Sequence, residues 1–204
     1  MKKPIILIGG GGHCKSCIDV IEQEGKYRIV GILDLPEMLG KEILGYKIIG
    51  TDDDLPKFLK TVNNFLVTIG QIKSPAKRIA LSQIVKKSGA TLPVIVSPHA
   101  YVAKSSNIGE GTIIMHQAIV NSEARIGLNC IVNSNVLIEH ETSIGDFCHI
   151  STGAIINGQT KIGNRCFIGS NATISNNVFI VDDAIISAGS IVLKDITAPG
   201  INIV

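Results

Sequence analysis

Residues 126–150, IGLNCIVNSNVLIEHETSIGDFCHI, carry Ile or Val at every sixth position. The same spacing extends from Val96 to Val192, and all seventeen positions of the series hold Ile or Val. Four residues after each member stands Ala, Ser, Thr, Cys or Val, except after the last, where Ile196 occupies the position. A β-branched column and a small column at a period of six are typical of a hexapeptide parallel β-helix, in which each short strand stacks on the strand one coil away.

The side-chain alternation of a strand locates the corners of this β-helix. A small residue and the Ile or Val two positions later face the same side, so both columns point inward. The position midway to the next small residue would also face inward if the strand continued, yet it holds polar side chains such as His140 and Asn176. Because a dry core does not accept unpaired polar groups, the chain must turn there. Three turns close a triangular prism with 18 residues per coil, and Cys130, Cys148 and Cys166 recur at that spacing as one inward column.

The first 93 residues follow a different pattern, in which strands alternate with helices. Three segments are predicted strands, namely KPIILIGGGGH, RIVGILD and NFLVTIGQ. A predicted helix, CKSCIDVIEQEG, lies between the first two strands, and a second predicted helix, SPAKRIALSQIVKKSGA, follows the third strand. The first helix is predicted to end at Gly25. This order predicts a Rossmann-like α/β domain over 1–93, with its ligand at the carboxyl ends of parallel strands, followed by the β-helix over 94–204.

Length, charge and hydropathy exclude several classes of protein. The 204 residues carry a net charge of +2 without a run of Lys or Arg, so no surface for nucleic acid or an anionic membrane is expected. The apolar run in MKKPIILIGGGG is too short for a signal peptide, and no stretch approaches the roughly 18 apolar residues of a membrane span. We therefore expect a soluble cytoplasmic protein. Because three of the five cysteines belong to the inward column, no disulfide framework is expected, and Cys14 and Cys17 are interpreted as ordinary helix residues.

The glycine turn after the first strand fits the start of a dinucleotide fingerprint. Gly9 and Gly11 match its first two glycines, but Cys14 stands where a third is expected. Asp34 closes the second strand, where an acidic residue would meet a ribose or a base. The alternative is a tight turn and a strand-end aspartate that bind nothing, and these residues alone leave both interpretations open.

Several motifs are similar to those of the hexapeptide-repeat sugar acetyltransferases. The most specific are IEHE followed by IGDFCHIS in the repeats, and GILD and VSPHA agree with them. Within that family the chain resembles the group of sialic acid O-acetyltransferases and UDP-4-amino-sugar N-acetyltransferases of bacterial surface-glycan pathways, over nearly its whole length. The resemblance implies a left-handed β-helix that forms homotrimers, with acetyl-CoA between neighbouring prisms and the sugar nucleotide in the N-terminal domain.

The sequence departs from this family in three places. Cys14 stands where the family often has a glycine after the N-terminal Gly-His pair. Ser97, Pro98 and His99 stand where the family has His-Pro-Ser. The chain stops at APGINIV, whereas family members continue into a Gly-Asn-Pro-Ala-Lys stretch that caps the last coil. We therefore expect a truncated C-terminus that lacks the acetyl-CoA contacts of that tail.

The chemistry of acetyl transfer accounts for the charged residues in IEHE. Transfer from a thioester needs a base for the acceptor and hydrogen-bond donors for the developing oxyanion, and it needs no metal. Histidine titrates near neutral pH, and His140 lies at a predicted corner where a substrate can reach it. A neighbouring carboxylate would orient the ring, and the resemblance favours Glu141 over Glu139 for that role. The alternative is a solvated corner with a chance Glu-His-Glu.

The remaining candidates divide between the two substrates. His149 is predicted to face outward from a flat side of the prism, and Gly158 would offer an unobstructed backbone N–H to the thioester oxygen unless it is only a corner glycine. The resemblance implies contacts to acetyl-CoA for His149, in the thioester region, and for Gly158, Ser170 and Ala188. It implies contacts to the sugar nucleotide for Gly11, Gly12, His13, Asp34, Leu35, Gly70 and Asn133.

Three functions follow from these features. The first is acetyl-CoA-dependent N-acetylation of a UDP-linked amino sugar, with His140 as general base, which the nucleotide-type residues of the first domain favour. The second is O-acetylation of a sialic-acid-like sugar. The third is a non-catalytic protein that binds a sugar nucleotide. The oriented base distinguishes the enzymes from the third, since a binding scaffold has no use for one.

Overall fold

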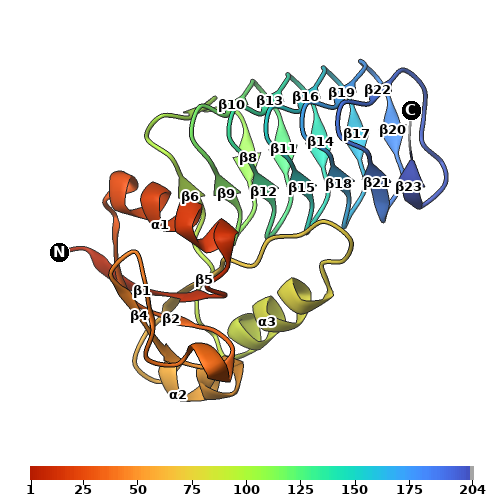
Figure 1. Cartoon of the computed structure of the whole chain (residues 1–204). Coiled ribbons are helices and arrows are strands. Elements are labelled where there is room, and N and C mark those ends of the chain that lie inside the picture. Colours follow the sequence, from red (N-terminus) through yellow and green to blue (C-terminus); the bar gives the residue numbers. More distant parts are fainter. Residues whose placement is uncertain (203–204) are drawn as a thin grey trace. The chain divides into compact units, whose positions relative to one another are not determined.

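A computed structural model describes residues 1–202 of the chain. The chain divides into two compact units, an α/β unit and a repeat unit (Figure 1). The α/β unit comprises Met1–Gly70 and Ala76–Ile95, and the repeat unit begins at Val96 and also includes Gln71–Pro75. In the described part of the chain, no helix has both the length and the apolar character needed to cross a membrane.

The α/β unit is built on one five-stranded sheet with strand order β3-β4-β2-β1-β5. All its pairings are parallel except that of β3 with β4. Its elements are β1 (Lys3–Ile8), α1 (Gly12–Glu24), β2 (Tyr27–Leu33), η1 (Pro36–Met38), β3 (Glu42–Ile43), β4 (Tyr46–Gly50), η2 (Asp52–Asp54), α2 (Leu55–Phe58), β5 (Asn64–Val67) and α3 (Ala76–Lys87). The three predicted strands and both predicted helices are confirmed.

The core of the α/β unit explains this arrangement. Ile5 and Ile8 of β1 are fully buried, as expected of a central strand covered on both faces. Helix α1 ends as predicted, because Gly25 takes a left-handed conformation with φ 71°. The β3–β4 hairpin was not predicted, because its turn uses Leu44 at φ 48° before Gly45 at φ 83°, and a leucine gives no turn signal.

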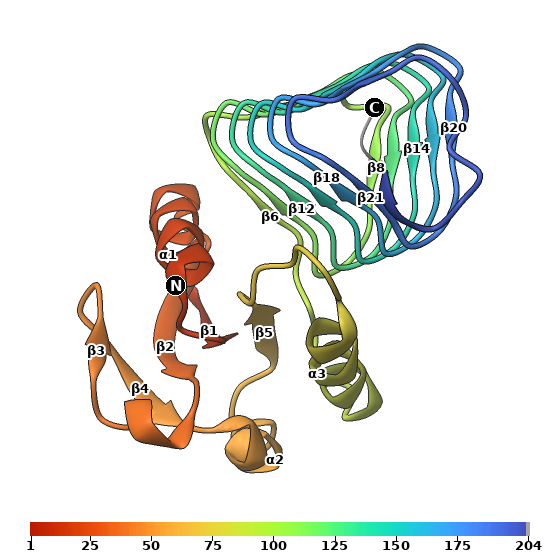
Figure 2. The same ribbon diagram turned by 45° about the vertical axis from the view of Figure 1, so that its right-hand side comes forward.

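The repeat unit is a β-helix of short strands, one for every hexapeptide, as predicted (Figure 2). Its first nine strands are β6 (Ile95–Val96), β7 (Tyr101–Val102), β8 (Asn107–Ile108), β9 (Ile113–Ile114), β10 (Ile119–Val120), β11 (Arg125–Ile126), β12 (Ile131–Val132), β13 (Leu137–Ile138) and β14 (Ser143–Ile144). The following strands are β15 (His149–Ile150), β16 (Ile155–Ile156), β17 (Lys161–Ile162), β18 (Phe167–Ile168), β19 (Thr173–Ile174), β20 (Phe179–Ile180), β21 (Ala184–Ile186), β22 (Ile191–Val192) and β23 (Gly200–Asn202).

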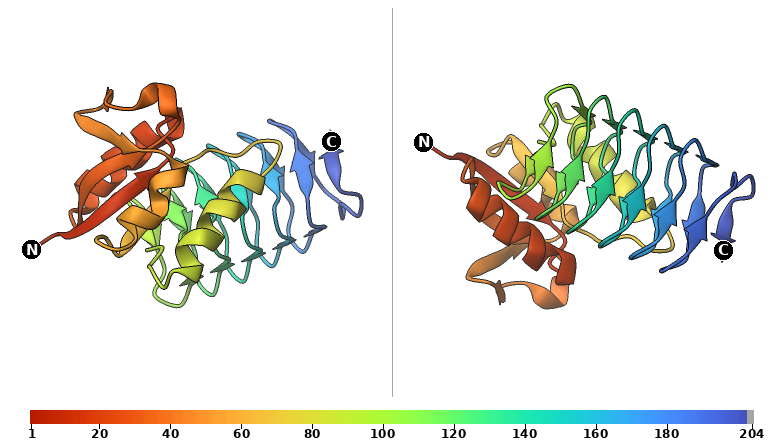
Figure 3. Two further views of the ribbon diagram at one scale, coloured as in Figure 1. Left: turned by 90° about the horizontal axis from the view of Figure 1, so that it is seen from below. Right: turned by 90° about the horizontal axis from the view of Figure 1, so that it is seen from above.

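Three parallel sheets form the faces of the prism, and Figure 3 shows the short strands of successive coils stacked side by side. We name each face after one strand. The β15 face has the order β23-β21-β18-β15-β12-β9-β6, the β13 face β22-β19-β16-β13-β10-β7, and the β14 face β20-β17-β14-β11-β8. His149 of β15 pairs with Ile131 and with Phe167, which confirms a coil of 18 residues. The predicted fold class, an α/β domain followed by a hexapeptide β-helix, is confirmed.

The corners of the prism share one backbone conformation. The second turn residue is left-handed in coil after coil, even where it is Glu141 (φ 59°) or Phe147 (φ 54°). The inward columns fill the core between the corners, and Cys130, Cys148 and Cys166 are all fully buried free thiols. At the far end, β23 pairs with β21 outside the hexapeptide series. The expected loss of a cap concerns residues beyond those described and stays a prediction.

Candidate active site

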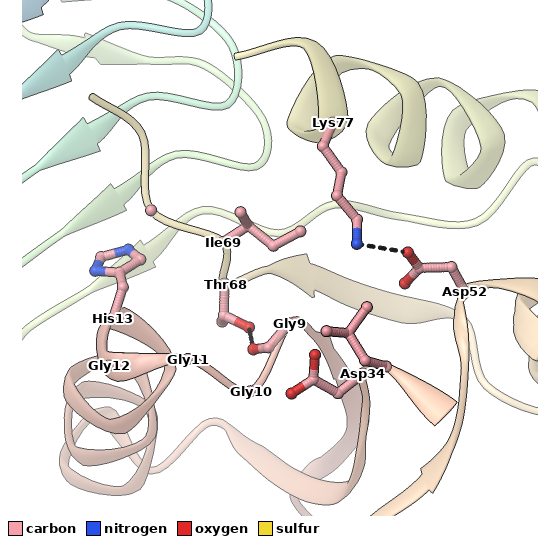
Figure 4. A pocket seen from close by; sticks show the side chains of 12 residues that line it. Gly9, Gly10, Gly11, Gly12, His13, Asp34, Asp52, Thr68, Ile69 and Lys77 are labelled. Carbon is pink, nitrogen blue, oxygen red and sulfur yellow. Dashed lines mark hydrogen bonds and ion pairs between the residues drawn. The ribbon is translucent and has the colours of Figure 1, made fainter. Parts of the chain in front are cut away.

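The carboxyl ends of β1, β2 and β5 surround a pocket of about 370 Å³ in the α/β unit (Figure 4). Six of the seven residues predicted to bind the sugar nucleotide line it, namely Gly11, Gly12, His13, Asp34, Leu35 and Gly70. The seventh, Asn133, belongs to the repeat unit and does not line this pocket. The strand ends therefore bring together residues far apart in sequence, as the parallel sheet predicts.

The glycine turn shapes one wall of the pocket. Gly9 has φ 104°, and a side chain there would overlap Ile69. A side chain at Gly10 would have to displace the Asp34 carboxylate, whereas the left-handed backbone at Gly9 itself favours glycine. Helix α1 begins beyond this turn without a side-chain cap. Its first backbone N–H groups are thus suited to an anion such as a diphosphate, and a side chain at Gly11 or Gly12 would meet no atom within 4 Å.

Beyond the glycine turn, four pocket residues were not predicted from the sequence, namely Asp52, Thr68, Ile69 and Lys77. Thr68 is buried and donates its hydroxyl to the Gly9 carbonyl oxygen at 2.6 Å, which ties β5 to the glycine turn. Ile69 packs beside the same turn. Lys77 forms an ion pair with Asp52 at 3.0 Å and brings a positive charge to the pocket. A lysine at the start of a predicted helix offers no signal of its own, because most such residues are solvated.

The histidine of the pocket is held by a cysteine. His13 Nε2 lies 3.4 Å from Cys17 Sγ, one helical turn away. Burial raises the pKa of the Cys17 thiol well above its usual value, so the sulfur keeps its proton and stays uncharged beside the ring. Burial also raises the pKa of Cys14 to about 11. Both cysteines are thus neutral packing residues near pH 7, in agreement with their interpretation as ordinary helix residues.

The predicted catalytic pair occupies the corner between the β13 and β14 faces. His140 Nδ1 lies 3.1 Å from Glu141 Oε2, so the left-handed turn at Glu141 brings its carboxylate to the ring. Since a carboxylate only accepts, Nδ1 carries the proton and the Nε2 lone pair is available. Glu139 is engaged elsewhere, because its carboxylate accepts a hydrogen bond from Asn121 at 2.9 Å. Glu141 also accepts one from Gln159 at 3.1 Å.

Gly158 lies one coil above His140 at the same corner position. A side chain there would come within 2.8 Å of His140 Nε2 and 3.4 Å of the Asn176 amide nitrogen, so glycine leaves a gap beside the imidazole ring. Gly158 is buried, and its N–H meets no acceptor among residues 1–202. An N–H without a partner, on a buried residue beside the His140 ring, is suited to a developing oxyanion.

A groove of about 550 Å³ adjoins this pair, and the sequence did not predict it. Glu141 and Gln159 line it on the corner, and Lys161 and Phe179 line it on the β14 face. Phe179 is exposed, and Lys161 supplies a positive charge. These residues form an apolar and cationic surface next to the predicted base.

The other predicted residues lie along the β15 face and the corner that joins it to the β13 face. His149 is 8% exposed, with Nδ1 at 2.6 Å from the Gln71 carbonyl oxygen and Nε2 at 3.3 Å from the Asn133 amide. Ser170 and Ala188 hold one corner position in successive coils, and the Ser170 hydroxyl lies 2.9 Å from that of Ser151. The predicted acetyl-CoA residues therefore lie in two places. Gly158 lies at the His140 corner, whereas His149, Ser170 and Ala188 lie on the β15 face and its corner with the β13 face.

An α/β unit with a pocket at its strand ends, followed by a β-helix with a His-carboxylate pair on its corner, is typical of a hexapeptide-repeat acyltransferase. Comparisons with known proteins agree with this class. The PglD N-terminal domain family matches residues 4–80, the bacterial transferase hexapeptide (six repeats) matches 141–176, and the hexapeptide repeat of succinyl-transferase matches 159–194. No curated protein matches the chain significantly.

Solved structures extend the likeness to the whole chain. A His-to-Asn variant of perosamine N-acetyltransferase from Caulobacter crescentus, in complex with CoA and GDP-perosamine, is 27% identical with a TM-score of 0.89 over 98% of this chain and 93% of that one. The acetyltransferase domain of PglB from Neisseria gonorrhoeae FA1090, in complex with acetyl coenzyme A, is 27% identical with a TM-score of 0.87 over 96% and 93%. WeeI from Acinetobacter baumannii AYE is 20% identical, and its TM-score of 0.80 over 96% and 93% shows a shared fold. The chain is thus similar to the PglD-like hexapeptide-repeat sugar N-acetyltransferases in its first domain, in its repeats and in its whole fold.

Proposed function

We propose that this protein transfers the acetyl group of acetyl-CoA to the amine of a nucleotide-linked amino sugar. The observation that carries the proposal is the corner at which His140 Nε2 borders the gap left by Gly158, a residue whose N–H has no acceptor among residues 1–202. A relative that binds CoA and GDP-perosamine and another that binds acetyl coenzyme A support both substrates.

The corner residues supply the steps of the reaction. Glu141 holds the Nδ1 proton of His140, so Nε2 takes a proton from the acceptor amine as its nitrogen attacks the thioester carbon. The Gly158 N–H stabilises the oxyanion of the tetrahedral intermediate. When the carbon–sulfur bond breaks, the protonated His140 returns its proton to the departing CoA thiolate. The proton removed from the amine ends on the CoA thiol, so the transfer needs no metal.

The pocket of the α/β unit is proposed to hold the nucleotide of the acceptor. The N–H groups around Gly11 and Gly12 suit the diphosphate, and Asp34 suits hydroxyl or N–H groups of the ribose or base. We propose UDP as the carrier, which follows from the sequence resemblance. GDP is the competing candidate, because the Caulobacter relative binds GDP-perosamine.

We further propose that the active site needs two chains of a homotrimer. His140 lies at the corner between the β13 and β14 faces, whereas His149 lies on the β15 face, the one face that does not form this corner. A single thioester cannot reach both sides of one prism. If His140, Gly158 and His149 act on one acetyl-CoA, His149 must come from a neighbouring prism. Light scattering at micromolar concentration tests this, and a monomer would contradict it.

A panel of acceptors tests the function. Purified protein is incubated with acetyl-CoA and UDP-, GDP- or dTDP-linked amino sugars, and with CMP-linked or free sialic acid, while released thiol is measured. We expect thiol release with an amino sugar linked to a nucleotide, greatest with UDP. Release only with sialic acids would favour the O-acetyltransferase, and binding without release from any acceptor would favour the non-catalytic protein.

A further inference from the structure

Gln71 lies in the connection between β5 and α3, yet it is buried to 3% exposure. Its side-chain amide donates to the Phe147 carbonyl oxygen at 2.9 Å. Its own backbone carbonyl oxygen lies 2.6 Å from His149 Nδ1. Both contacts lie within the repeat unit, to which Gln71–Pro75 belongs. A loop residue is thus fixed at two points on the chain around His149.

These contacts determine where the proton of His149 lies. A carbonyl oxygen only accepts, so Nδ1 must be the nitrogen that carries hydrogen. The Asn133 side-chain oxygen accepts the Ser134 N–H at 2.8 Å, so the NH₂ group of the same amide faces His149 Nε2 at 3.3 Å. Both neighbours therefore select the neutral ring with hydrogen on Nδ1 and a lone pair on Nε2.

This tautomer limits what His149 can offer to a ligand. A hydrogen bond to the thioester carbonyl oxygen requires an N–H group, and Nε2 has none in this form. The Nε2 lone pair can instead accept a hydrogen bond from an N–H group. The pantetheine arm of acetyl-CoA carries such groups in its secondary amides. The Asn133 contact, at 3.3 Å, is long enough for a ligand amide to replace it with a better one.

We infer that Gln71 is a positioning residue that keeps His149 in the Nδ1–H form, and that His149 accepts a hydrogen bond from an amide N–H of acetyl-CoA. The inference rests on the proposed function for the identity of the ligand. It differs from a role at the thioester oxygen, which needs the opposite tautomer. The side chain of Gln71 acts indirectly, because its bond to Phe147 fixes the carbonyl that holds the ring.

Two variants test the role of the side chain. Gln71→Met keeps the length and the packing but cannot donate to Phe147. Gln83→Ala is the matched control, because Gln83 is an exposed amide on α3. Two-bond ¹H–¹⁵N NMR of ¹⁵N-histidine protein reports the tautomer of each ring, and His149→Gln assigns the His149 signals. Acetyl-CoA affinity is measured by calorimetry without an acceptor.

The expected result has two parts. Wild-type and Gln83→Ala protein show the Nδ1–H form, whereas Gln71→Met shows a mixture and a Kd for acetyl-CoA raised about 5- to 10-fold, the loss of one hydrogen bond. An Nε2–H ring in the wild type would overturn the inference without any variant. A change in tautomer or in affinity without the other would also overturn it. If both change but no acceptor is acetylated by the wild type, the inference stands and the proposed function fails.

Discussion

The two units hold their functional side chains in different ways. The pocket of the α/β unit gathers short pieces of chain from Gly9 to Lys77, and backbone groups form much of its wall. The corner of the repeat unit takes its proposed base and the carboxylate beside it from adjacent residues, His140 and Glu141. Its backbone is the same as that of other corners, which carry unrelated side chains.

The two units differ in whether their site residues can be replaced without disturbing the fold. In the α/β unit, a side chain at Gly9 or Gly10 would collide with a neighbour, so the pocket and the fold depend on the same residues. In the repeat unit, the inward Ile and Val columns define the fold, and an outward corner residue contributes little to it. We therefore expect substitutions at the corner to affect turnover alone, and those in the pocket to affect substrate binding.

The largest expected effect is that of His140→Ala. Removal of a positioned base should lower kcat by about 100- to 10,000-fold. Because the side chain is exposed at a corner, the thermal midpoint of unfolding should stay unchanged, as should the affinity for acetyl-CoA. Steady-state kinetics and a melting curve measure both. Ser122→Ala, one coil earlier at the same corner, is the control, and a turnover of His140→Ala near that of the control would show that the pair is only a corner.

Asp34→Ala tests the pocket. Loss of a charged hydrogen-bond acceptor should raise the KM of the acceptor by about 10- to 100-fold and leave that of acetyl-CoA unchanged. Asp53→Ala is the control, since Asp53 is exposed and does not line the pocket. An equal change in both KM values would mean that the α/β unit does not hold the acceptor.

Glu141→Gln should have a smaller effect than loss of the base. The amide keeps the size of the side chain but not its charge, so we expect kcat to fall about 10-fold while the base remains. Glu123→Gln is a close control, because Glu123 holds the same corner position one coil earlier with φ 61°. Wild-type turnover in Glu141→Gln would show that the carboxylate does not orient His140.

The smallest effect is expected at the cysteines of α1. With the pKa of Cys14 raised to about 11 by burial, only about one thiol in a thousand is ionised at pH 8. Iodoacetamide should therefore leave Cys14 and Cys17 unmodified at pH 8 in the folded protein, and mass spectrometry of peptides measures this. Modification should increase as the pH rises toward 11. Rapid labelling at pH 8 would indicate a redox or metal role for the pair.

The sequence predicted the repeat unit strand by strand because its period reflects a single packing requirement. Each Ile or Val that faces inward fixes one strand, and the polar residue midway fixes one corner. The left-handed turn at Glu141 was beyond such reasoning, since its conformation is imposed by the corners above and below rather than by the residue itself. That turn is what brings the carboxylate to His140.

The sequence predicted less of the α/β unit because its smaller elements depend on tertiary contacts. Strand β4 pairs with β2 alongside a two-residue β3, and neither has a long alternating pattern. Lys77 and Asp52 reach the pocket from a helix start and a short 3-10 helix that carry no nucleotide motif. Gln71 stood last in the predicted strand segment NFLVTIGQ without any functional signal, and only the structure shows that it contacts His149.

The 18-residue coil restricts how the length of this chain can change over evolutionary time. His140 and His149 are nine residues apart, half a coil, which places one on a corner and the other on the opposite face. Deletion of one hexapeptide between them would move His149 and every later residue to the neighbouring face, although the inward Ile and Val columns would stay intact. Only insertions or deletions of whole coils keep each side chain on its face, and each shortens or lengthens the prism by about 4.8 Å. Family members are therefore expected to differ in repeat number by multiples of three hexapeptides.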